Sequence, residues 1–152
     1  MLPLYFWRRD SHSSDPSKDK KLYFGDPLLY TVAHERAPGL AVDVAAAVEN
    51  AAALSLLHRY EPKESLVEGF DTVERLHVWA TRSGGKVDFV CGAYRSVAAV
   101  EVKHRARIDR RSVQGVIRAL PDGPVVVATK ELLELHGDHA LIPSSLLLWA
   151  LG

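Results

Sequence analysis

The chain has 152 residues, of which 47% are hydrophobic and 25% are charged, a composition typical of one compact globular domain. Its formal net charge is zero, which excludes a uniformly basic nucleic-acid binder but leaves room for a local basic surface. A single cysteine, Cys91, excludes an internal disulfide, and no apolar stretch reaches the roughly 18 residues of a membrane span. We therefore expect a cytoplasmic protein without a membrane segment.

The N-terminal region predicts a β-hairpin extension followed by a short helix. Residues 2–9 predict a strand that pairs with residues 21–24 across a polar loop. Asp26 precedes a proline and predicts the start of a helix over residues 27–35. Because a two-stranded ribbon cannot bury the three aromatic side chains of residues 5–7 alone, we expect them to pack on a second chain or another domain.

Residues 43–60 carry the clearest helix pattern in the chain. Asp43 can cap the helix, alanine and leucine fill it, and a proline lies just beyond its end. Helical spacing predicts one face that is made of Val44, Val48, Ala51, Ala52 and Ser55. Glu49 stands beside this face. The charged residues 61–75 predict a loop with a helical turn.

The remaining sequence alternates between strand and helix patterns. The strands are expected at residues 76–82, 86–90, 96–103 and 124–129, and the helices at residues 109–120, 130–136 and 144–151. This order predicts an α/β fold in which a mixed central sheet is flanked by helices. We expect a single domain over residues 1–152, with residues 1–24 as the hairpin extension and residues 43–152 as the core.

Three charged residues interrupt the apolar strands of this predicted core. Side chains alternate across a strand, so Glu101 and Lys103 share one face. If residues 86–90 and 96–103 are neighbouring strands, Asp88 can lie beside Glu101. Two carboxylates that close repel each other, and bound Mg²⁺ would remove this conflict. Lys103 would then hold a phosphate oxygen or an attacking water.

Two interpretations of these charges remain open. Glu101 and Lys103 could form the solvent-exposed end of a strand, with Asp88 as an ordinary acid near a turn. Their position inside apolar runs favours a site instead. A basic cluster follows Lys103 and could grip phosphates or form a solvated loop and helix start. This cluster comprises His104, Arg105, Arg107, Arg110 and Arg111.

Glu49, Asp88 and the Glu101-Val102-Lys103 triplet together resemble the core of the PD-(D/E)XK, or restriction-endonuclease-like, superfamily. The blocks KKLYFGDPLL, VENAAALSLLHR, WATRSGGKVDFV and AAVEVKH resemble, in that order, the C-terminal domain of prokaryotic AAA+-type ATPases of unassigned function. The resemblance implies a core of order αβββαβ, with Asp88 and Glu101 as ligands of Mg²⁺. It further implies that Lys103 orients or deprotonates water and that Glu49 assists.

The resemblance also implies a function, and the sequence departs from the family pattern at two positions. It implies Mg²⁺-dependent hydrolysis of phosphodiester bonds in DNA; the alternative is a catalytically silent module that binds DNA or a protein. Lys86 stands where the family usually has an acid, and His104 where it usually has a small polar residue. No GxxxxGK[ST] motif occurs, so an ATPase domain would be a partner or a missing part of a longer product. A homo-oligomer is the other expected assembly.

Overall fold

The computed structural model describes residues 1–36, 43–61, 73–80, 85–93, 96–119 and 123–152. Its elements in chain order are β1 (Leu2–Leu4), β2 (Phe6–Arg8), β3 (Ser13–Asp15), β4 (Lys21–Tyr23), α1 (Leu29–Arg36), α2 (Val44–Tyr60), β5 (Leu76–Ala80), β6 (Lys86–Ala93), β7 (Ser96–Lys103), α4 (Arg110–Ala119), β8 (Val125–Thr129), β9 (Glu134–Leu135), β10 (His139–Pro143) and α5 (Ser144–Leu151). Most of the predicted loop over residues 61–75 and the tip of the β5–β6 turn lie outside the described residues.

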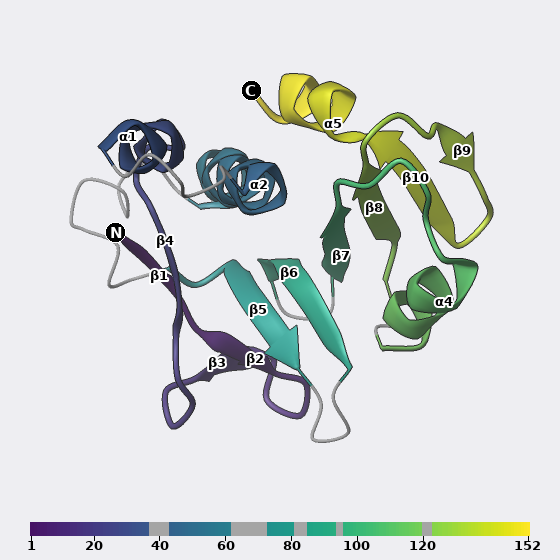
Figure 1. The fold of residues 1–152 in the computed structure, drawn as a ribbon. Coiled ribbons are helices and arrows are strands. Elements are labelled where there is room, and N and C mark those ends of the chain that lie inside the picture. The colour runs from purple at the N-terminus through teal and green to yellow at the C-terminus, as the bar shows by residue number, and fades with distance from the viewer. Residues whose placement is uncertain (37–42, 62–72, 81–84, 94–95, 120–122) are drawn as a thin grey trace.

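An eight-stranded mixed sheet forms the centre of the molecule, in the order β3-β2-β5-β6-β7-β8-β10-β9. Strand β6 runs antiparallel to both β5 and β7, whereas β5 is parallel to β2 and β8 is parallel to both β7 and β10. Helices α2 and α5 cover one face and α4 covers the other (Figure 1). In the part of the chain described, no helix is both long enough and apolar enough to cross a bilayer.

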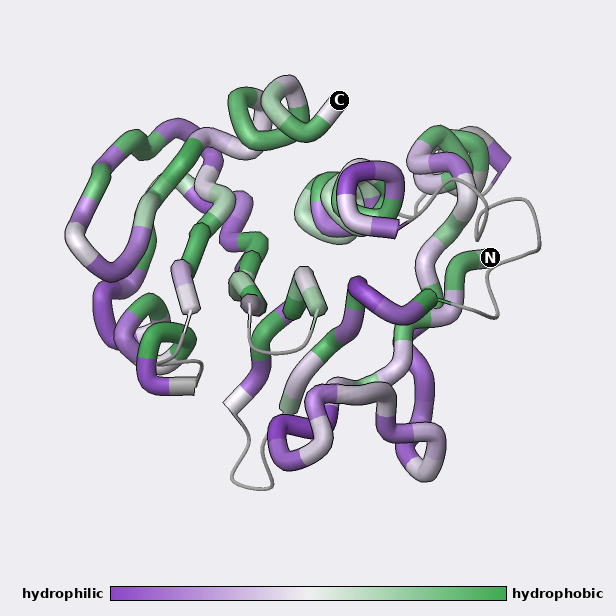
Figure 2. The backbone as a smooth tube through the Cα atoms, turned by 180° about the vertical axis from the view of Figure 1, so that it is seen from behind, coloured by the Kyte–Doolittle hydropathy of each residue, from purple (hydrophilic) through white to green (hydrophobic). Residues whose placement is uncertain are grey.

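The order of elements from α2 to β8 confirms the predicted mixed α/β fold. The all-apolar strand β8 is buried between two parallel neighbours, as its sequence indicates. Two hydrophobic clusters flank the sheet: one packs against α2 and α5, and the other against α4. Hydrophobic colouring accordingly follows the central strands and α5, while hydrophilic segments gather in the N-terminal loops (Figure 2).

Helix α2 begins where its sequence predicts but buries a different face. Asp43 caps it by accepting a hydrogen bond from the Ala46 N–H at 3.0 Å. The face that the spacing groups is not the one that packs on the sheet: of its five residues only Ala52 is buried, whereas Val44 is exposed and Val48, Ala51 and Ser55 are half-buried. The buried residues are Asn50, Ala52, Ala53, Leu56 and Leu57. Apolar side chains occupy most of the circumference of this helix, so their spacing alone does not distinguish the face that meets the sheet.

The helix predicted over residues 130–136 is wrong. Residues 134 and 135 instead form β9, which pairs antiparallel with β10. The Thr129 hydroxyl donates to the Leu132 carbonyl at 2.8 Å, and the His136 N–H donates to the His139 carbonyl at 2.9 Å. A seven-residue helix is marginal alone. Pairing with the open edge of β10 provides hydrogen bonds that local helix propensity cannot match.

The predicted pairing of residues 2–9 with residues 21–24 is confirmed only for residues 2–4. Strand β1 pairs antiparallel with β4 in a separate two-stranded sheet, but the chain then continues into β2. Strand β2 pairs with β3 and with β5, where Phe6 stands opposite Val78. Trp7 is buried in the cluster on the α4 side. The expectation that residues 5–7 need another chain is therefore wrong for Trp7, which packs within its own chain.

His77 on β5 makes stability sensitive to acid. The ring is buried, and its Nε2 lies 3.1 Å from the Ser14 hydroxyl of β3. Burial lowers the pKa of His77 from 6.5 to about 4. The unfolded chain therefore takes up this proton first, and stability falls as the pH drops from 6.5 towards 4, by about 3 kcal/mol in total.

Thermal melts at stepwise pH values between 7.5 and 4 test this expectation. The His77→Gln variant keeps a neutral polar side chain and should lose less stability than the wild type over this range. Comparing the two proteins removes the contribution of other titrating groups. Parallel stability curves for the two proteins would show that His77 titrates normally in the folded state.

Candidate acidic site between strands β6 and β7

Asp88 and Glu101 meet at the point where the β6–β7 ladder ends. The last regular pair at this end is Phe89 with Val100. Beyond it, the Asp88 N–H donates to Glu101 Oε2 at 3.1 Å, and the Val102 N–H donates to Asp88 Oδ2 at 2.9 Å. Each carboxylate thus replaces a ladder hydrogen bond. These bonds fix one oxygen of each carboxylate in the gap between the two strands.

A β-bulge in β6 aims Asp88 into this gap. His77 of β5 pairs with Val90 and Trp79 pairs with Val87, so two residues of β6 stand opposite Val78 alone. As a result, Val87 packs on the α4 side of the sheet, whereas Phe89 packs on the α2 side. Strict alternation would place both residues on one face. The bulge therefore changes the direction of the side chain between them.

Two lysines neutralise most of the acidic charge at this site. Lys21 of β4 lies with its Nζ 2.5 Å from Glu49 Oε1 and 3.5 Å from Asp88 Oδ1. Lys103 forms an ion pair with Glu101 Oε1. Three carboxylates therefore face two ammonium groups. The side chains become less accessible along the series, with 23% exposure for Glu49, 17% for Asp88 and 5% for Glu101.

Burial and mutual repulsion disfavour the ionised carboxylates. Burial raises the pKa of Asp88, and the charge of Glu49 raises it further. Burial likewise raises the pKa of Glu101, with a further increase from Asp88. The two lysines and the backbone N–H groups offset only part of these effects. The site thus favours an additional positive charge near the two carboxylates.

Two further residues hold β4 against α2, and the sequence did not single them out. The Tyr23 hydroxyl donates to Glu49 Oε1 at 2.8 Å. The fully buried Asn50 side chain accepts from the Phe24 N–H at 2.7 Å and donates to the Phe24 carbonyl at 3.0 Å. These bonds position Lys21 over the site. In the sequence, the signal for this contact is an asparagine within an alanine-rich helix, because a buried polar side chain there needs a hydrogen-bond partner.

The structure brings only some of the predicted site residues together. Asp88, Glu101 and Lys103 lie together, and Glu49 reaches Asp88 through the shared Lys21 ammonium. His104 is half-buried, with its Nδ1 3.4 Å from the Ser144 hydroxyl. The four arginines of the predicted basic cluster are exposed. Two of them, Arg110 and Arg111, begin α4, which covers the face of the sheet opposite α2.

The oxygen ligands at this site fit a hard divalent cation. Within the described residues, no three His, Cys, Asp or Glu side chains form a ready-made metal centre. Mg²⁺ needs fewer protein ligands, since it commonly binds one or two carboxylates and completes its shell with water and phosphate oxygens. Asp88 Oδ1 and Glu101 Oε1 each contact a lysine ammonium and, within the described part of the chain, accept no backbone hydrogen bond. These ammonium groups stand in for the charge that a cation would supply.

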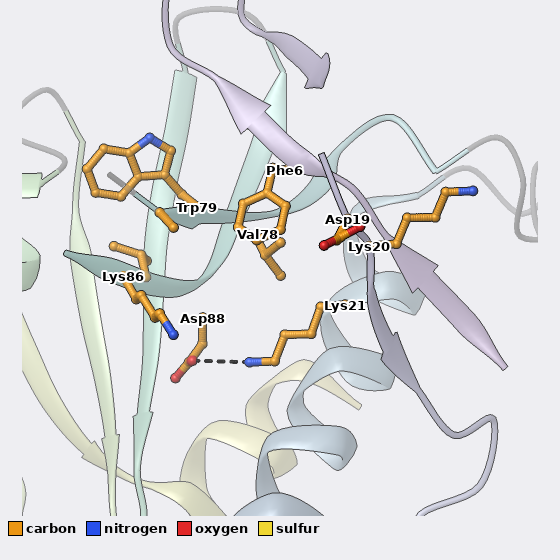
Figure 3. Close-up of a pocket in the computed structure, with 10 residues that line it drawn as sticks. Phe6, Asp19, Lys20, Lys21, Val78, Trp79, Lys86 and Asp88 are labelled. Atoms are coloured by element: carbon orange, nitrogen blue, oxygen red, sulfur yellow. Dashed lines mark ion pairs between the residues drawn. The ribbon is translucent and has the colours of Figure 1, made fainter. Parts of the chain in front are cut away.

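A cavity of about 250 Å³ opens beside Asp88. Strands β5 and β6, Phe6 of β2 and the segment leading into β4 surround it. The side chains of Lys21 and Lys86 extend towards Asp88, whereas Lys20 points away (Figure 3). The lining residues are Phe6, Asp19, Lys20, Lys21, Val78, Trp79, Ala80, Lys86, Val87 and Asp88. The acidic site therefore has an adjoining space that a ligand can enter.

Comparison with known proteins identifies the family of the chain. Residues 45–147 match the model of a domain of unknown function, DUF4143. The match covers more than half of the chain, and the protein belongs to this family. No curated protein and no solved structure matches the chain significantly. The matched segment contains α2 and the strands that carry Asp88, Glu101 and Lys103.

Proposed function

We propose that this member of the DUF4143 family hydrolyses phosphodiester bonds in DNA with the help of Mg²⁺, and that it is a PD-(D/E)XK relative. The convergence of Asp88, Glu101 and Lys103 at one strand gap is the observation that carries the proposal. The element order α2-β5-β6-β7-α4-β8 agrees with the αβββαβ core that the resemblance implies. The raised pKa values of both carboxylates give a physical reason for cation binding.

Each residue of the site has a distinct role in this proposal. Asp88 and Glu101 would hold the cation, and the backbone N–H bonds keep both carboxylates oriented before it binds. Bound Mg²⁺ would supply an activated water and charge stabilisation. Lys103 would hold the attacking water or a phosphate oxygen. Glu49 anchors Lys21, so that this ammonium stays beside Asp88 and can contact the incoming phosphate.

A second candidate is a catalytically silent module that binds DNA or a protein. The ion pairs of Lys21 with Glu49 and of Lys103 with Glu101 favour it, because they already neutralise much of the site. In that case the lysines would be permanent counterions. An ATPase domain is the partner class that we propose for either function, on the strength of the sequence resemblance.

Cleavage and thermal stability together test the proposal. Wild-type protein should cut single- or double-stranded DNA in Mg²⁺ and not in EDTA. Mg²⁺ should also raise the melting temperature, since a ligand at ten times its Kd stabilises the folded state by about 1.4 kcal/mol. Asp88→Asn should lose both effects. In EDTA near pH 7 this variant should be at least as stable as wild type, because a raised carboxylate pKa means that ionisation costs folding stability.

Two outcomes would contradict the nuclease proposal. The absence of cleavage together with a Mg²⁺-independent melting temperature would favour the silent module. Equal stabilisation of wild type and Asp88→Asn by Mg²⁺ would place the cation elsewhere. Circular dichroism of the variant in EDTA provides the control for folding.

A further inference from the structure

The cavity beside Asp88 combines an apolar wall with a cationic end. Phe6, Val78 and Ala80 line the wall, and Phe6 is only half-buried. Lys86 lies at the end nearest Asp88 and extends towards it (Figure 3). Aromatic and aliphatic surface next to ammonium groups matches the base and the phosphate of a nucleotide.

We infer that this cavity receives one unpaired nucleotide of a single-stranded DNA, with its base against Phe6 and Val78 and its phosphate at Lys86. The inference rests on the proposed function, because it names the substrate class of the same site. A volume of about 250 Å³ lies just below the range usual for small-molecule sites. It suits one base and excludes a stacked base pair.

The geometry selects an unpaired base for an energetic reason. A base within a duplex must leave its stack and its partner before it can enter a cavity, which costs a few kcal/mol. An unpaired base in a single strand or an overhang avoids this cost. Asp19 at the rim adds a hydrogen-bond acceptor, which suits the exocyclic amino group of adenine, cytosine or guanine.

Lys86 is available for a phosphate, in contrast to Lys21. Lys21 is held between Glu49 and Asp88. Lys86 is exposed and has no ion-pair partner among the residues that the structure describes. It precedes Asp88 by two residues on β6, roughly 7 Å along the strand. This separation is comparable with that between successive phosphates of an extended strand, so one phosphate at Lys86 would place the next near the carboxylates.

Fluorescence of a single-stranded oligonucleotide containing 2-aminopurine tests the inference in EDTA, where no cleavage occurs. Binding to wild-type protein should change the fluorescence of the probe, and a blunt duplex of the same sequence should bind more weakly. Ala80→Phe fills the cavity and should weaken single-strand binding about tenfold, through the loss of one stacked base. Lys86→Gln should lower the slope of log affinity against log salt concentration by about 0.7.

Lys130→Gln is the matched control, since it removes an exposed lysine that does not line the cavity and should leave probe binding unchanged. Thermal melts check that Ala80→Phe folds, and Lys86→Gln provides an independent surface variant. Binding that is sensitive to both substitutions, without cleavage in Mg²⁺, would support the inference and overturn only the proposed hydrolysis. If the protein cleaves DNA but neither substitution affects probe binding, the inference about the cavity is overturned and the proposed hydrolysis stands.

Discussion

Replacing Lys103 with glutamine should lower Mg²⁺-dependent cleavage of DNA by at least about a hundredfold while leaving most DNA binding intact. The Lys103 ammonium contacts Glu101 at the strand gap, where the proposed attacking water and phosphate would meet. Removal of one preorganised donor from a catalytic site commonly costs 10²- to 10³-fold in turnover. One lysine is a small part of a phosphate-binding surface, so turnover should fall far more than affinity.

Single-turnover cleavage and equilibrium DNA binding measure the two effects separately. Lys130→Gln is a close control, because Lys130 directly follows Thr129, the residue paired with Lys103 across β7 and β8. A thermal melt of each variant with and without Mg²⁺ completes the test. If Lys103 is instead a structural counterion, its loss would strand the buried Glu101 carboxylate. Stability would then fall by about 3–5 kcal/mol, and Mg²⁺ would not restore it.

The sequence draws attention to the three charged residues of the candidate site because charge inside an apolar strand is a local signal. That pattern singles out Asp88, Glu101 and Lys103, and these side chains lie together in the structure. The element order from α2 to β8 was predicted for a similar reason, because each element has a clear period and a recognisable start. Local sequence patterns are enough to predict a feature that depends on one helix or strand.

The sequence does not predict features that depend on contacts between distant segments. The sequence pattern places Lys21 only in a hairpin strand, yet tertiary packing places it between Glu49 and Asp88. The bulge beside Asp88 arises from the pairing of β5 with β6, which no local pattern encodes. The strand at residues 134 and 135 likewise exists because β10 offers it an edge. In each case long-range hydrogen bonds or ion pairs decide the structure.

Replacing Gly92 with alanine should destabilise the protein by about 4 kcal/mol or more, the largest stability effect that we expect from a single methyl group. Gly92 lies in β6 with φ of +119°, a conformation that side chains rarely adopt. A Cβ at this position would come within 2.2 Å of the Ser96 carbonyl oxygen and 3.3 Å of the Val97 Cα. Both atoms are backbone atoms, so no rotamer change can relieve the contact.

The same substitution should also disrupt the acidic site. Gly92 pairs with Val97, and this pairing helps to set the β6–β7 register that brings Asp88 to Glu101. A shift of one residue would turn the side chains of a strand to the other face. Urea denaturation of Gly92→Ala should therefore show a lower midpoint, and Mg²⁺ should not stabilise the variant as it does the wild type.

Gly115→Ala provides the matched control for this prediction. Gly115 is exposed in α4, and a Cβ there would meet nothing within 4 Å. Alanine in a helix interior is favoured over glycine by roughly 0.5–1 kcal/mol, so this variant should be slightly more stable than wild type. Equal midpoints for the two alanine variants would contradict the β6–β7 pairing. The acidic site would then lose its structural basis, because that pairing is what places one carboxylate beside the other.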